Sequence, residues 1–92
     1  MEMGWGSDVE VERKRRIIVS VWAYGYEVEN DSIVSDEMFD FECLRIVTTT
    51  GTGNEIVDKF FREEFVAESG IWIHRHPELE GVKKLYVRYY QL

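Results

Sequence analysis

The chain has 92 residues, a formal net charge of −7 and 14% aromatic residues. A chain of this length forms one domain, and its negative charge disfavours nucleic acid and anionic membranes as partners, because both reward Lys and Arg. The single cysteine, Cys43, excludes an intrachain disulfide, and no apolar run is long enough for a signal peptide or a membrane span, so a cytoplasmic location is expected.

Two regions are expected along the chain. Residues 1–11 contain glycines and acidic residues without clear periodicity, and they are predicted to form a flexible N-terminal tether. Residues 12–92 are predicted to form a single α+β domain. Its first element is a long strand over residues 15–29, which are rich in β-branched and aromatic side chains. Alternation along that strand places Trp22, Tyr24 and Tyr26 on one aromatic face.

The remaining elements follow from turn signals and periodicity. Asn30-Asp31-Ser32 predicts a turn, and residues 38–49 a second strand of mixed pattern, typical of a sheet edge. Residues 54–69 predict the one amphipathic helix, with Asn54 as its N-cap and Gly70 as a left-handed residue after its end. Third and fourth strands are predicted at 71–76 and 82–92. The expected fold is a two-layer α+β sandwich, one helix on a four-stranded, mostly antiparallel sheet in the order β-β-α-β-β.

An acidic segment beside the aromatic strand face suggests a binding surface. Residues 27–42 hold seven carboxylates and no Lys or Arg, so they would attract a basic surface on a larger protein. Trp22, Tyr24 and Tyr26 would add buried area, because Trp and Tyr are enriched at interfaces. A two-fold homodimer that buries the aromatic faces is compatible with this hypothesis and would also remove them from water. The acidic residues predicted to bind the partner are Asp36, Glu37, Asp40 and Glu42.

The last predicted strand offers a different binding chemistry. Lys84, Tyr86, Arg88 and Tyr90 alternate cations with aromatics on one strand face, a pattern that several single-strand nucleic-acid readers use. The net charge of −7 opposes this alternative. Neither hypothesis needs a cofactor.

Chemistry-bearing motifs are weak. His74 and His76 would share one face of a strand, but no second ligand pair stands at a recognisable interval, so no metal site is predicted. The glycines before the helix lack the Lys-Ser/Thr of a P-loop. No catalytic residue is predicted. The sequence therefore favours a small, acidic, non-enzymatic protein-interaction module that acts stoichiometrically as an inhibitor or adaptor, with a single-stranded nucleic-acid binder as the alternative.

Overall fold

The computed structural model of the chain describes residues 8–90, which form four α-helices and one short 3-10 helix. No strand occurs within this range. The predicted α+β sandwich with a four-stranded sheet is therefore wrong, and the fold is all-helical. Of the predicted tether, residues 8–11 form the first turn of α1, and residues 1–7 lie outside the described part.

Helix α1, Asp8–Glu27, replaces the predicted first strand and is the central element. Its buried residues recur at intervals of three or four, which is the period of a helix and not of a strand. They are Glu12, Arg16, Val19, Ser20, Ala23 and Tyr24, with Val21 and Gly25 beside them. Two of these buried positions, Glu12 and Arg16, are charged. Most of the apolar residues of α1 therefore lie from Ile17 onward, in a nearly continuous run that resembles a strand.

The end of α1 is fixed by a close approach. Asn30 adopts a left-handed conformation with φ of 54°, which Asn tolerates better than most residues. The backbone N–H of Asp31 then donates to the carbonyl oxygen of Gly25 at 2.8 Å. A Cβ atom at Gly25 would lie 2.7 Å from Ile33 Cδ1 and 3.1 Å from the Asp31 carbonyl oxygen, so glycine gives the chain room to fold back here.

Two shorter helices follow. Helix α2, Asp36–Leu44, lies where the second strand was predicted, and the Ser35 hydroxyl accepts a hydrogen bond from the Met38 N–H at its start. Helix α3, Glu55–Glu63, confirms the one predicted helix and its N-cap, because the Asn54 side chain accepts from the Val57 N–H. It ends six residues early. Gly70 has φ of −107°, so its predicted left-handed role is wrong.

The last two predicted strands are also helical. Ile71–Arg75 forms the 3-10 helix η1, and Leu79–Tyr90 forms helix α4, which begins just after Pro77. In α4 the buried Val82 and Tyr86 are four residues apart, as expected for a helix face. Alternation along a strand had put Tyr86 on an exposed face.

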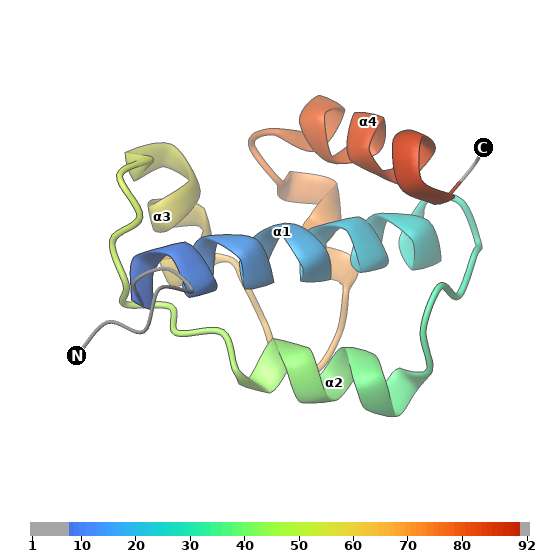
Figure 1. Cartoon of the computed structure of the whole chain (residues 1–92), viewed down its shortest axis with the longest axis horizontal. Helices are drawn as coiled ribbons and strands as arrows, with labels where there is room; N and C mark the ends of the chain where they lie inside the picture. Colours follow the sequence, from blue (N-terminus) through green and yellow to red (C-terminus); the bar gives the residue numbers. More distant parts are fainter. Residues whose placement is uncertain (1–7, 91–92) are drawn as a thin grey trace.

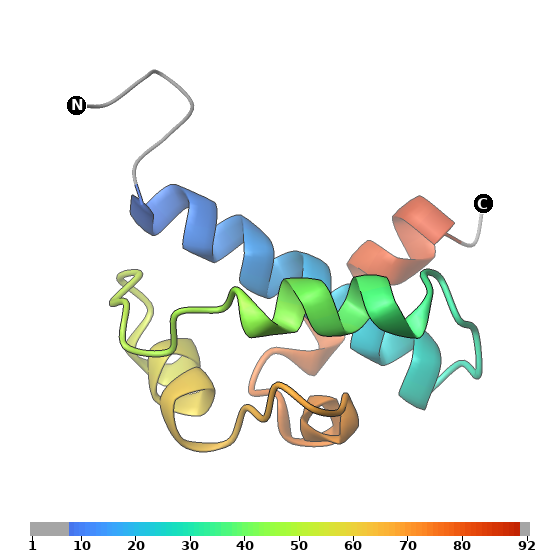
Figure 2. The same cartoon turned by 90° about the horizontal axis from the view of Figure 1, so that it is seen from below.

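Helix α1 runs through the middle of the molecule (Figure 1). Helices α4 and α2 lie on opposite sides of it, and Figure 2 shows α3 and η1 together on a third side. The core forms where these elements meet α1, with aromatic rings of Phe60, Phe61, Phe65 and Trp72 packed at centroid distances of 5.0 to 6.1 Å. None of the helices between residues 8 and 90 is both long and apolar enough to cross a membrane.

Candidate functional site

A pocket of about 390 Å³ opens between the C-terminal end of α1, helix α2 and the turn before η1. This volume is in the range of small-molecule and side-chain binding pockets. We call it the acid–aromatic pocket, and its lining residues are Trp22, Tyr26, Glu27, Ser32, Ile33, Val34, Asp36, Phe39, Asp40, Glu68, Ser69 and Gly70.

Helix geometry brings the main side chains together. Trp22 and Tyr26 are one turn apart on α1, and both line the pocket. On α2, Asp36 and Asp40 have the same spacing, and Phe39 lies between them. The Ser35 cap fixes where α2 begins, and therefore where these carboxylates stand.

The turn before η1 closes the third side. A Cβ atom at Gly70 would lie 3.2 Å from the Ala23 Cβ and 3.4 Å from the Phe39 Cζ, so the turn approaches both α1 and α2 closely. This contact brings Glu68 and Ser69 to the edge of the pocket. Gly70 thus has a packing role in place of the predicted helix-ending one.

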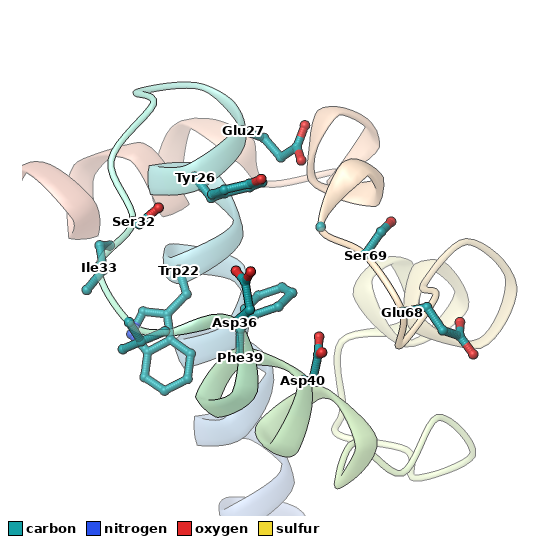
Figure 3. Close-up of a pocket in the computed structure, with 12 residues that line it drawn as sticks. Trp22, Tyr26, Glu27, Ser32, Ile33, Asp36, Phe39, Asp40, Glu68 and Ser69 are labelled. Carbon is teal, nitrogen blue, oxygen red and sulfur yellow. The ribbon is translucent and has the colours of Figure 1, made fainter.

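The pocket is strongly acidic. Four carboxylates from three separate elements line it, and no Lys or Arg does (Figure 3). One of them, Glu27, has a histidine beside it: His74 Nε2 lies 3.4 Å from Glu27 Oε1, and the two form an ion pair when the histidine is protonated. Carboxylates of like charge raise one another's energy, and a bound cation would relieve this. Aromatic walls attract the same ligand, because a cation is drawn to the face of a ring. The arrangement suits a positively charged organic group.

The structure brings together four of the seven residues predicted to bind a partner: Trp22, Tyr26, Asp36 and Asp40. Tyr24 instead packs in the core against Tyr86, at 5.3 Å between ring centroids, and donates its hydroxyl to Glu29. Burial raises the pKa of Tyr24, and the hydrogen bond to Glu29 raises it further.

The two remaining predicted carboxylates lie outside the pocket. Glu37 is exposed on α2, and Glu42 forms an ion pair with Arg15 at 3.2 Å. Sequence reasoning missed the contributions of Phe39 and Glu68. Phe39 would follow from reading residues 36–44 as a helix, since positions three and four apart share a face. Nothing in the sequence signals that Glu68 reaches this place.

The other candidate residues do not form a shared site. Tyr86 is buried and donates its hydroxyl to Asp31 at 2.8 Å, whereas Lys84, Arg88 and Tyr90 are exposed on α4. His76 accepts a hydrogen bond from the Glu78 N–H at Nδ1. Among residues 8–90, no group of three His, Cys, Asp or Glu side chains is arranged to hold a metal ion.

A second polar cluster lies in the N-terminal half of α1, and its charged residues Glu12, Arg16 and Asp58 are buried. Arg16 donates to Glu12 Oε2 at 2.7 Å and to Asp58 Oδ1 at 2.9 Å. It also donates to the carbonyl oxygens of Val47 and Thr50, at 2.9 and 3.0 Å. Glu12 Oε1 accepts from the Val47 N–H at 3.0 Å. This buried network ties α1 to the connection between α2 and α3.

Asp58 receives further donors within the network. The N–H and the hydroxyl of Thr52 both donate to its carboxylate, at 2.9 and 2.6 Å. Burial alone would raise the pKa of Asp58, but the hydrogen bonds from Thr52 and Arg16 together lower it. The charged groups are thus matched to one another, so we assign this cluster to folding.

Comparisons with protein-family models, curated proteins and solved structures find no match for this chain. The fold and the acid–aromatic pocket alone describe this protein: it is a small helical domain with an acidic, aromatic-walled pocket at its surface.

Proposed function

We propose that the protein is a non-enzymatic binding module that acts stoichiometrically, as an inhibitor or adaptor, on a larger protein with a basic surface. The acid–aromatic pocket receives a cationic side chain of that partner. The observation that carries the proposal is the lining of this pocket, which includes four carboxylates and three aromatic rings and no Lys or Arg side chain.

Arginine is the side chain that fits this lining best. Its guanidinium group is planar, stacks on aromatic faces and donates to two carboxylate oxygens at once. Trp22 and Phe39 offer rings, while Asp36 and Asp40 offer acceptors one helical turn apart. A lysine would gain the charge attraction but not the stacking of a flat group. The order of affinity expected is arginine above lysine, and both above a neutral side chain.

The exposed charges around the pocket also steer the approach of a partner. The carboxylates of residues 27–42 extend the acidic field beyond the pocket itself. Exposed charges are screened over about 10 Å at 0.1 M salt, so binding should weaken as salt rises. The stacking component should persist, because it does not depend on long-range attraction.

The test uses N-acetyl-arginine amide, N-acetyl-lysine amide and arginine-rich hexapeptides as probes. Site-resolved ¹H–¹⁵N NMR follows the indole N–H of Trp22 and the backbone of α2. Replacing Asp36 and Asp40 together with Asn should weaken arginine binding about ten-fold, since each exposed pair contributes about 0.2–1 kcal/mol.

The matched control is the double variant Glu37→Gln with Glu63→Gln. It also removes two negative charges, but from exposed carboxylates that do not line the pocket. Equal weakening in the two double variants would show only a general charge effect and would refute the pocket assignment. Shifts spread evenly over the surface, without a maximum at Trp22, would do the same.

A further inference from the structure

A second surface hollow lies next to the acid–aromatic pocket and shares Trp22 with it. It is a groove of about 350 Å³ between α1 and α4, lined by Ile17, Ile18, Val21, Trp22, Leu85, Tyr89 and Tyr90. Several of these side chains are far from buried, with Ile18 44% and Tyr89 64% exposed. A contiguous apolar strip of this kind on a small domain commonly marks an interaction surface. We call it the α1–α4 groove.

The two helices that form the α1–α4 groove carry positive charge, although the chain as a whole is acidic. Residues 13–26 of α1 and 81–90 of α4 contain no Asp or Glu. Lys14, Lys84 and Arg88 are exposed, and none of them is in an ion pair with another of the described residues. The Arg88 guanidinium stands 5.5 Å from the ring of Tyr89, at the wall of the groove. The groove therefore fits an apolar ligand with negative charges beside it.

Helix α2 has the complementary chemistry on its outer face. Met38, Phe41 and Leu44 are spaced three apart and are 47%, 56% and 72% exposed. This spacing puts them on one side of the helix, and we call them the α2 stripe. The same helix begins with acidic residues, Asp36 and Glu37. The α2 stripe is thus a short, amphipathic helix face that is largely exposed, with the Arg45 guanidinium 5.3 Å from the ring of Phe41 as a partial cover.

We propose that the α2 stripe of one copy of the protein docks into the α1–α4 groove of a second copy. The apolar side chains of the stripe meet the apolar floor of the groove, as an amphipathic helix does in other helix-in-groove complexes. The acidic residues of α2 then face the cations beside the groove. At contact distance this local match outweighs the repulsion between two net negative molecules, which salt screens.

The kind of contact sets how the assembly grows. The stripe lies on α2 and the groove between α1 and α4, so each contact joins two unlike surfaces. The contact is head-to-tail, and it extends a chain of molecules or closes a ring. A single helix face buries less than the roughly 800 Å² per partner of a stable interface, so association is concentration-dependent and weak.

Sedimentation velocity on the full chain tests the proposal, from dilute solution up to about 1 mM, where a weak complex becomes populated. The wild type should shift to larger species as concentration rises. Leu44→Lys disables the stripe and keeps the groove, whereas Ile18→Glu disables the groove and keeps the stripe. Each variant alone should stay monomeric at every concentration.

The decisive sample is the equimolar mixture of the two variants. One intact stripe and one intact groove remain, so the mixture should form a dimer that does not grow further. Ile56→Lys, at a 70% exposed site on α3, is the matched control and should associate like the wild type. Circular dichroism of all three variants checks that each remains helical.

Three results would overturn the proposal. They are a wild type that is monomeric throughout, association that survives in either disabled variant, and a mixture that yields no dimer. A monomeric wild type that binds an unrelated acidic amphipathic peptide through Ile18 would assign the groove to a different protein instead.

Discussion

Replacing Arg16 with Met is the sharpest test of what holds this fold together. The Arg16 side chain is 3% exposed, and its guanidinium donates to Glu12, to Asp58 and to two backbone carbonyl oxygens. Methionine fills a similar volume but supplies no donor. Two buried carboxylates then lose their cation, and this kind of change costs about 3–5 kcal/mol.

That loss is large against the total stability of a domain, which is about 5–15 kcal/mol. Urea unfolding followed by circular dichroism measures it directly. Arg75→Met is the control, because the Arg75–Glu64 ion pair is exposed and contributes about 0–1 kcal/mol. A loss below about 1 kcal/mol in Arg16→Met would refute the assignment of the network to folding.

The pH dependence of this variant gives an independent check. In the wild type the pKa of Asp58 is lowered from its ordinary value of 3.8, so its contribution is present at neutral pH and is lost as pH falls through the acid range. Without Arg16 the buried Asp58 carboxylate is less stabilised, and protonation relieves the penalty. The stability difference between variant and wild type should therefore shrink below pH 4 or thereabouts. A gap that stays constant with pH would contradict the ionic origin of the loss.

Three further outcomes are expected. Gly25→Ala should lower the free energy of unfolding by about 1–3 kcal/mol, because its Cβ would lie 2.7 Å from Ile33 Cδ1, whereas Gly81→Ala meets nothing within 4 Å and should raise it by about 0.5–1 kcal/mol in urea titrations. Burial raises the pKa of the Cys43 thiol to about 12, so a disulfide reagent should label it only after unfolding; rapid labelling without urea would contradict this. Burial lowers the pKa of His76 below 6.5, so its contribution to stability should be complete above that pH and should decline as pH falls; NMR titration of its ring should give a midpoint below 6.5.

Helix α3 was predictable because its signals agree with one another. Asn54 caps it, and most of its apolar and charged residues separate onto two faces, with the buried Asp58 and the exposed Ile56 as exceptions. Helix α1 was not, because two of its core-facing positions are Glu12 and Arg16, while Ile17 and Ile18 are exposed. The buried network replaces apolar residues on the inner face, so helical periodicity is hidden. The i,i+4 pair Glu12–Arg16 and the i,i+3 pair Glu10–Arg13 were the available signs of a helix.

The candidate site was partly predictable for a geometric reason. Residues four apart share a face in both a strand and a helix, because four is a multiple of two and is close to 3.6. Trp22 and Tyr26 therefore stay together although the predicted strand is wrong. Asp36 and Asp40 were grouped only as members of the acidic segment, since Asp36 precedes the predicted second strand, and α2 places them one turn apart. Tyr24, two positions from each of its neighbours in the set, shares their face only in a strand, and in α1 it turns into the core.

The buried network and the acid–aromatic pocket lie at opposite ends of α1, and this separates stability from binding. Arg16 ties the N-terminal half of α1 to α3 through Asp58, whereas Asp36 and Asp40 lie outside this network. We therefore expect the two pocket carboxylates to contribute little to stability. Removing both charges relieves repulsion in the pocket but loses a favourable acidic residue in the first turn of α2, worth about 0.3–1 kcal/mol. These effects oppose each other, so the Asp36→Asn with Asp40→Asn variant should unfold close to the wild-type temperature. Weakened arginine binding at unchanged stability would mark the carboxylates as ligand-binding groups, whereas a large loss of stability would mark them as structural.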